Sequence, residues 1–158
     1  MKFYLGIFCA LIIHFGVLSQ QDSTHLSHKH PKNEIGIAFS PTYFLSDNIT
    51  TFSAHIHFVH KIGHSKFGIG ASFERVIFTP KHSTFGMVMT YEPIEHLSFT
   101  FAPGVTIEDS NPVPIFSMHF ESAYTFELGA FHLGPAMEYA RDKNDSHLSL
   151  GIHVAYGF

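Results

Sequence analysis

The chain ends with the stretch SLGIHVAYGF, residues 149–158, in which large apolar residues alternate with small or polar ones. The apolar positions are Leu150, Ile152, Val154, Tyr156 and Phe158. In an extended strand these side chains share one face, and the Ser, Gly, His and Ala residues between them share the other. A strand with two such faces suits the boundary between a lipid-like phase and a confined polar interior.

The same period-two alternation recurs along the chain and predicts eight strands. We place them at residues 34–45, 51–62, 66–78, 84–94, 96–108, 114–128, 131–140 and 147–158. Eight is the smallest common even number of strands in a membrane barrel. We therefore predict an all-β fold, an eight-stranded antiparallel up-and-down transmembrane β-barrel formed by residues 34–158.

A soluble barrel could have the same period, so the composition of the two faces decides between them. The polar face of a soluble barrel points into water and carries many charged residues. In this chain that face is mostly Gly, Ala, Ser and Thr, and the other face is almost uniformly Phe, Ile, Leu and Met. Small residues suit the narrow lumen of an eight-stranded barrel, and the apolar face suits hydrocarbon.

In its strand pattern and its terminal strand ending on Phe158, the chain resembles the small eight-stranded outer-membrane β-barrel proteins of bacteria, such as the transmembrane domains of OmpA and OmpX. The resemblance implies a monomer in the outer membrane, surrounded by membrane lipid and lipopolysaccharide. It also implies recognition of the last strand by the barrel-assembly machinery. The formal net charge of −4 and the lack of a basic stripe argue against a nucleic-acid partner.

The first 19 residues indicate export. Lys2 is followed by an apolar stretch from Phe3 to Leu18, which predicts a cleaved signal peptide at residues 1–19. Cys9, the only cysteine, would leave with it. Residues 20–33 then form a flexible, His-rich periplasmic leader. No later apolar run approaches the roughly 18 residues of a membrane helix.

Three prolines fall inside predicted strands, namely Pro41, Pro103 and Pro135. Proline cannot donate a hydrogen bond to a neighbouring strand, so we expect β-bulges there and an uncertain register beyond each of them.

Histidine and glutamate dominate the predicted lumen. Of the 14 histidines, four are assigned to turns or their edges: His64, His82, His96 and His147. The residues predicted to point inward are His55, His57, His119, His132, His153, Glu74, Glu92, Glu121, Glu127 and Glu138. The only basic residue with the same direction is Lys61, near a rim. Carboxylates without a basic partner in a narrow interior need a proton, imidazolium, water or a metal cation beside them.

Neutral imidazole and carboxylate together form a good ligand set for zinc, copper or nickel. The candidate metal ligands in the lumen are His55, His57, His119, Glu121, Glu74 and His153. The leader offers a second candidate group, formed by His25, His28 and His30. The pattern favours a hydrogen-bonded His–Glu network that contains ordered water, and a specific metal site is the alternative.

Two other functions remain as alternatives, an enzyme that modifies outer-membrane lipid and a narrow solute or cation pore. A lipid-modifying enzyme needs a nucleophile and a base beside the lipid. The outward faces offer only His60 and Ser122, on strands expected at opposite sides of the barrel. A lumen this narrow is usually filled by side chains, which argues against a pore. We therefore expect a non-enzymatic envelope protein with a structural or surface role, in which the inward His/Glu cluster offers a candidate site for divalent metal.

Overall fold

The computed structural model describes residues 31–158. The expected signal peptide and the leader residues His25, His28 and His30 lie outside the described residues. Within residues 31–158, no helix has the length and apolar character needed to cross a membrane.

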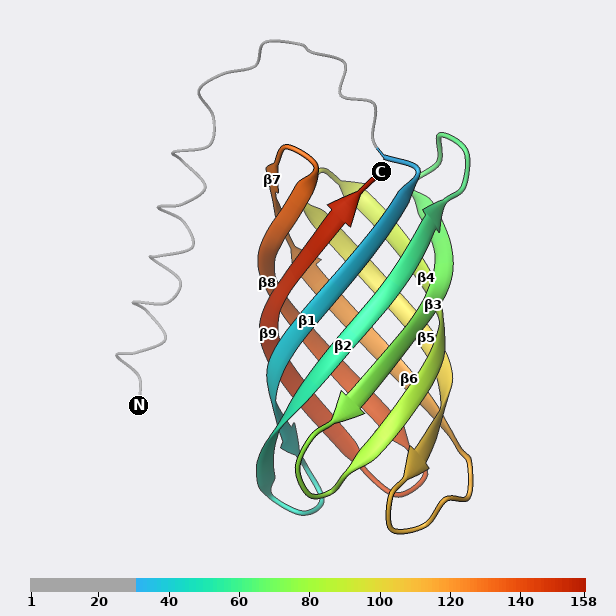
Figure 1. Cartoon of the computed structure of the whole chain (residues 1–158), viewed down its shortest axis with the longest axis vertical. Coiled ribbons are helices and arrows are strands. Elements are labelled where there is room, and N and C mark those ends of the chain that lie inside the picture. The colour runs from blue at the N-terminus through green and yellow to red at the C-terminus, as the bar shows by residue number, and fades with distance from the viewer. Residues whose placement is uncertain (1–30) are drawn as a thin grey trace, which may run out of the picture.

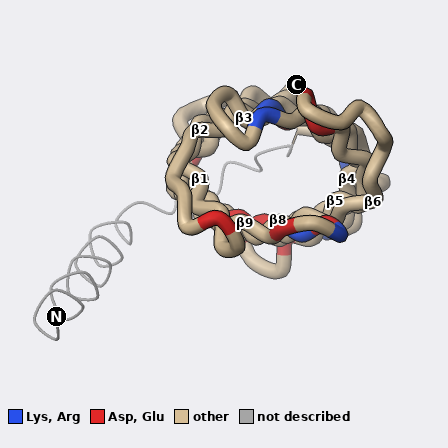
Figure 2. The backbone as a smooth tube through the Cα atoms, turned by 90° about the horizontal axis from the view of Figure 1, so that it is seen from below, with Lys and Arg blue, Asp and Glu red and all other residues tan. Residues whose placement is uncertain are grey.

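The described residues form nine antiparallel strands in one closed sheet (Figure 1). The strands are β1 (Asn33–Phe44), β2 (Ile49–Lys61), β3 (Phe67–Val76), β4 (His82–Ile94), β5 (Leu97–Glu108), β6 (Ile115–Tyr124), β7 (Phe126–Leu128), β8 (Phe131–Asp142) and β9 (Ser146–Gly157). Each pairs with its neighbour in sequence up to β6, and β1 pairs with β9. The pairing of β6 with β8 closes the ring, which Figure 2 shows along the barrel axis. The predicted all-β barrel is confirmed.

The strand predicted at residues 114–128 is divided into β6 and β7 at Thr125. Both parts pair with β8 in one continuous register, so together they occupy a single position in the ring of eight. In that register Tyr124 faces Pro135, which has no N–H to donate. The backbone N–H of Thr125 instead donates to the carbonyl of His96 at 2.8 Å.

The expectation of bulges at the three prolines is wrong. Pro41 pairs with Phe52, Pro103 with Met118 and Pro135 with Ile152, each without a change of register. Each proline interrupts pairing with only one neighbouring strand, and the register is the same on both sides of the gap. Among the described ladders, the one register shift lies between Tyr91 and Ile94, beside Pro93.

The two faces of the sheet have the predicted polarity. The exterior carries exposed apolar side chains on every long strand, and Phe39, in the middle of β1, is 63% exposed. The interior is packed with Ala, Ser, Thr, His and Glu. This distribution is the inverse of a soluble protein and is the one expected where hydrocarbon surrounds the barrel.

The two ends of the barrel differ in how their interiors are filled. Both the start of β1 and the end of β9 lie at one end, which we call the terminal end (Figure 1). A cavity of about 60 Å³ lies inside it, bounded in part by Glu34, His57 and Lys61. At the opposite, far end the lumen is filled by Phe44, which is 2% exposed, and by fully buried Val76. The lumen therefore has more free space at the terminal end.

An ion pair at the far end joins β3 to the turn after β5. The Arg75 guanidinium donates to both carboxylate oxygens of Asp109, at 2.7 and 2.6 Å, and to Ser83 Oγ at 2.8 Å. Hydrogen bonding to Arg75 holds the pKa of the Asp109 carboxyl below its usual range. Because the pair is exposed, solvent screens it, and it orients the turn more than it stabilises the barrel.

Candidate metal centre

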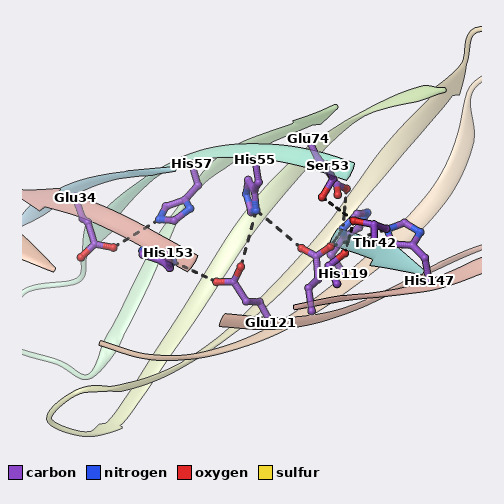
Figure 3. Close-up of polar contacts among 12 residues, drawn as sticks. Glu34, Thr42, Ser53, His55, His57, Glu74, His119, Glu121, His147 and His153 are labelled. Carbon is purple, nitrogen blue, oxygen red and sulfur yellow. Dashed lines mark hydrogen bonds and ion pairs between the residues drawn. The ribbon is translucent and has the colours of Figure 1, made fainter. Parts of the chain in front are cut away.

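A column of imidazoles and carboxylates runs along the lumen (Figure 3). It consists of four groups, each with three ligand atoms within 4.8 Å of one another. We call them the terminal group (Glu34, His57, His153), the middle group (His55, Glu121, Glu138), the far group (Glu74, His119, Glu138) and the end group (Glu74, His82, His147). The middle and far groups share Glu138, the far and end groups share Glu74, and the terminal group shares no ligand with the others.

Small neighbours leave room for these side chains. His55 faces Ala38 across the β1–β2 ladder, and His119 faces Ala102 across β5–β6. Gly36 faces His57, and a Cβ at Gly36 would collide with the His57 imidazole and lie 3.2 Å from His153 Nε2. The alternation of small and ionisable residues along the inward faces is what lets the imidazoles meet near the barrel axis.

Gly36→Ala is expected to destabilise the folded barrel by about 1–3 kcal/mol, the usual cost of overpacking a filled interior. Equilibrium unfolding in detergent with guanidinium measures this loss. In the double variant Gly36→Ala/His57→Ala most of the cost of the added methyl group should disappear, because the colliding imidazole is gone. An equal cost in both backgrounds would show that the close approach to His57 is not its cause.

The terminal group adjoins the rim. Glu34 Oε1 lies 3.6 Å from His57 Nε2, and Glu34 Oε2 accepts a hydrogen bond from His132 Nδ1 at 3.0 Å. Closer to the rim, Lys61 Nζ donates to Glu92 Oε2 at 2.7 Å. Within residues 31–158, Lys61 is the one Lys or Arg on an inward strand face. It pairs with Glu92, so the deeper carboxylates have only imidazoles as cationic partners.

The middle group brings two carboxylates together. Glu121 and Glu138 are direct partners on β6 and β8, and both are buried. His55 Nδ1 lies 3.9 Å from an oxygen of each. Like charges at directly opposed positions destabilise a sheet, so this pair needs a cation or a shared proton.

The far group contains the shortest contacts deep in the column. His119 Nδ1 lies 3.3 Å from Glu138 Oε1 and 3.5 Å from Glu74 Oε2. A void of about 10 Å³ is bounded by these three residues together with His55 and Glu121. The space is of the order of a single water-sized probe, enough for one small ion among the side chains.

Two histidines assigned to turn edges from the sequence, His82 and His147, belong instead to the lumen. Both are buried, near the first residues of β4 and β9, and both join Glu74 in the end group. Their inward position continues the strand phase that places Thr84 and Ser149 inside. Extending the strand predicted at residues 84–94 by two residues would have identified His82, and applying the inward phase to the first residue of the strand predicted at 147–158 would have identified His147. Glu34, in the inward phase of β1, was likewise missed.

The six candidate ligands predicted for the lumen do line it, but not at one point. His57 and His153 belong to the terminal group, His55 and Glu121 to the middle group, and Glu74 and His119 to the far group. Glu138 links the middle and far groups. Glu127 points inward as predicted and borders the cavity at the terminal end, but β7 lies at the rim and leaves this side chain exposed.

The outward polar residues do not form a catalytic pair. His60 Nδ1 hydrogen-bonds with Asn33 Oδ1 at 2.8 Å at the terminal edge of β2. Ser122 lies on β6, and three strands separate β2 from β6 in either direction around the ring. A Ser–His dyad between them is therefore excluded by the strand order.

Comparison with known proteins identifies the architecture. No protein-family model and no curated protein sequence matches the chain. The structure is similar to Neisserial surface protein A (NspA), with a TM-score of 0.54 and 13% identity over 80% of this chain and 96% of that one. It is also similar to Ail, the attachment invasion locus protein of Yersinia pestis, with a TM-score of 0.55 and 12% identity over 82% of this chain and 99% of that one.

A de novo designed transmembrane β-barrel matches equally well, with a TM-score of 0.55 and 13% identity over 81% of this chain and 97% of the design. At such identities the likeness shows the fold alone. The strand pattern predicted a resemblance to small outer-membrane barrels, and this resemblance is confirmed for the fold.

Proposed function

We propose that this chain, which has the fold of the small eight-stranded outer-membrane β-barrels, is an integral outer-membrane protein that holds a divalent metal ion in its lumen. The ion would lie in the far group, between His119, Glu74 and Glu138. The observation that carries the proposal is the pair of contacts from His119 Nδ1 to the two carboxylates, at 3.3 and 3.5 Å.

These distances fit metal ligands better than direct hydrogen bonds. Nitrogen–oxygen hydrogen bonds are usually about 2.7–3.2 Å long. Ligand atoms held tetrahedrally at about 2.0–2.1 Å from zinc lie about 3.3 Å from one another. The spacing around His119 is therefore close to that of zinc ligands.

Unpartnered polar atoms support the same site. Among residues 31–158, the buried oxygens Glu74 Oε2 and Glu138 Oε1 accept no hydrogen bond. A buried carboxylate without compensation is costly, and one partner imidazole is shared between the two. A divalent cation would neutralise both carboxylates and coordinate these atoms. Zinc, copper and nickel all accept this donor set.

The filled lumen favours a binding role over a pore. At the far end of the lumen, Phe44 packs against His147 with ring centroids 4.8 Å apart, and Val76 is fully buried. A solute would have to displace these side chains to leave at the far end. The separation of His60 and Ser122 favours a non-enzymatic protein, since this base and this nucleophile do not lie side by side on the exterior.

The terminal strand supports the proposed route to the membrane. β9 ends beside β1, where the backbone N–H of Phe158 donates to the Asn33 carbonyl at 2.8 Å. We propose that the signal peptide is cleaved, that the assembly machinery recognises the strand ending on Phe158, and that the barrel stands as a monomer among lipopolysaccharide and lipid. The leader histidines would collect metal in the periplasm.

Zinc titration of the refolded chain tests the metal site. The chain should begin at Gln20 and carry His25→Ala, His28→Ala and His30→Ala, so that the leader contributes no ligand. We expect saturable zinc binding by calorimetry, weakened at least about 10-fold by His119→Ala, which removes the central ligand.

His64→Ala is the matched control, because His64 is an exposed turn residue outside the four groups. Its affinity for zinc should equal that of the parent. The proposal fails if zinc binding disappears with the leader histidines alone, or if His119→Ala binds zinc as tightly as His64→Ala.

A further inference from the structure

We infer that the far part of the lumen holds a second metal ion beside the first, in a two-metal centre whose shared ligand is the Glu74 carboxylate. The second ion would be coordinated by the end group. This inference rests on the proposed metal binding by the far group and adds the number, position and bridging of the ions.

The end group is a complete donor set in its own right. Ligand atoms of Glu74, His82 and His147 all lie within 4.8 Å of one another, and all three residues are buried. They come from β3, β4 and β9: β3 pairs directly with β4, whereas β9 is hydrogen-bonded to neither of them. Two imidazoles and one carboxylate form a common zinc ligand set.

Glu74 belongs to both groups, and this is the feature that points to a shared centre. A carboxylate has two oxygens and can bind one ion with each. In two-metal sites the ions are about 3.5–4 Å apart. The remaining ligands of the two groups are close enough for such a centre, since His147 Nε2 lies 4.0 Å from Glu138 Oε1 and the His119 and His147 ring centroids are 6.0 Å apart.

The end group also has atoms that need a partner. Within the described part of the chain, His147 Nε2 and Glu74 Oε2 are buried and have no hydrogen-bond partner. Leaving a buried polar atom unpaired is unfavourable. An ion at this position would coordinate His147 Nε2, whereas an ion confined to the far group would coordinate Glu74 Oε2 and leave His147 Nε2 without a partner.

Charge and packing suit a second ion at this depth. Glu74, Glu121 and Glu138 are buried in the same part of the lumen, where no Lys or Arg of residues 31–158 opposes them. Phe44 covers the end group from the far end, with its ring 5.8 Å from that of His82 and 4.8 Å from that of His147. The second ion would therefore enter along the lumen from the terminal end.

Metal stoichiometry and spin coupling test this inference on the same leader-substituted chain. Equilibrium dialysis followed by elemental analysis should give about two zinc ions per folded chain. With copper(II), electron paramagnetic resonance should show the coupled signal of two neighbouring ions. The variant His82→Ala/His147→Ala should retain about one ion and lose the coupling, and His64→Ala should behave as the parent.

A second variant guards against misfolding. If the double variant does not reach the heat-modifiable, folded form on a gel, His147→Gln alone should still lose one ion, because the amide keeps the polarity of the site but is a poor metal ligand.

Each outcome separates the two proposals. A single ion that depends on His119 would overturn the two-metal centre and leave the proposed function intact. Two uncoupled ions that survive the His82→Ala/His147→Ala change would also overturn it. No bound ion would overturn both.

Discussion

Phe39→Lys is expected to destabilise the barrel in lipid by about 2–4 kcal/mol, whereas Ile35→Lys on the same strand should cost only about 0–1 kcal/mol. Both side chains point outward from β1, and they are 63% and 43% exposed. Phe39 lies midway along the strand, at the level expected for the centre of the bilayer, farthest from water on either side. Ile35 lies near the terminal end, where a lysine side chain can reach the interface.

Reversible unfolding of both variants in lipid bilayers measures this difference. The pair is matched in strand and face, so it isolates depth in the membrane. A water-exposed exterior would accept a lysine at either position, and the two variants would then differ little. Equal free energies of unfolding would therefore contradict the assignment of this face to lipid.

Glu138→Gln is expected to weaken zinc binding at least about 100-fold, equivalent to about 2.7 kcal/mol. Glu138 lies within 4.0 Å of imidazole nitrogens from His55, His119 and His147, more than any other carboxylate of the column. The substitution keeps the size of the side chain and removes its charge. Competition against a chromophoric zinc chelator gives the affinity.

Glu121→Gln is the matched control for this loss. Glu121 is the direct cross-strand partner of Glu138 and equally buried, but it lies outside the far group. Its substitution removes the same charge from the same level of the lumen. If the two variants lose equal affinity, the effect is one of general lumen charge, and the ion is not ligated by Glu138.

The fold was predictable from the sequence because each face of a barrel strand meets a different medium. Phe, Ile and Leu on one face and Gly, Ala and Ser on the other fixed the direction of side chains such as His55 and Glu74 without knowledge of strand pairing. Pro41, Pro103 and Pro135 misled the prediction, because a proline can lose one ladder contact while the strand keeps its register on the other side.

The arrangement of the candidate site was only partly predictable. Whether a side chain points into the lumen follows from the alternation along its own strand. The level of that side chain along the barrel axis depends on the register between neighbouring strands. The alternation therefore places Glu121 and His119 inside, but it does not place Glu138 opposite Glu121 or Glu74 beside His119. His82 was missed because the strand predicted at residues 84–94 stopped short of it, and His147 was missed because, as the first residue of the strand predicted at 147–158, it was assigned to the adjoining turn; the end group depends on both.

The most direct test of the metal-binding lumen is the anomalous scattering of zinc in crystals of the leader-substituted chain grown with the metal. Data on either side of the zinc absorption edge would locate each bound ion. The account predicts strong anomalous density inside the barrel between His119, Glu74 and Glu138, with a second peak toward His82 and His147. A fully loaded crystal with zinc only on the barrel surface, and none in the lumen, would contradict it.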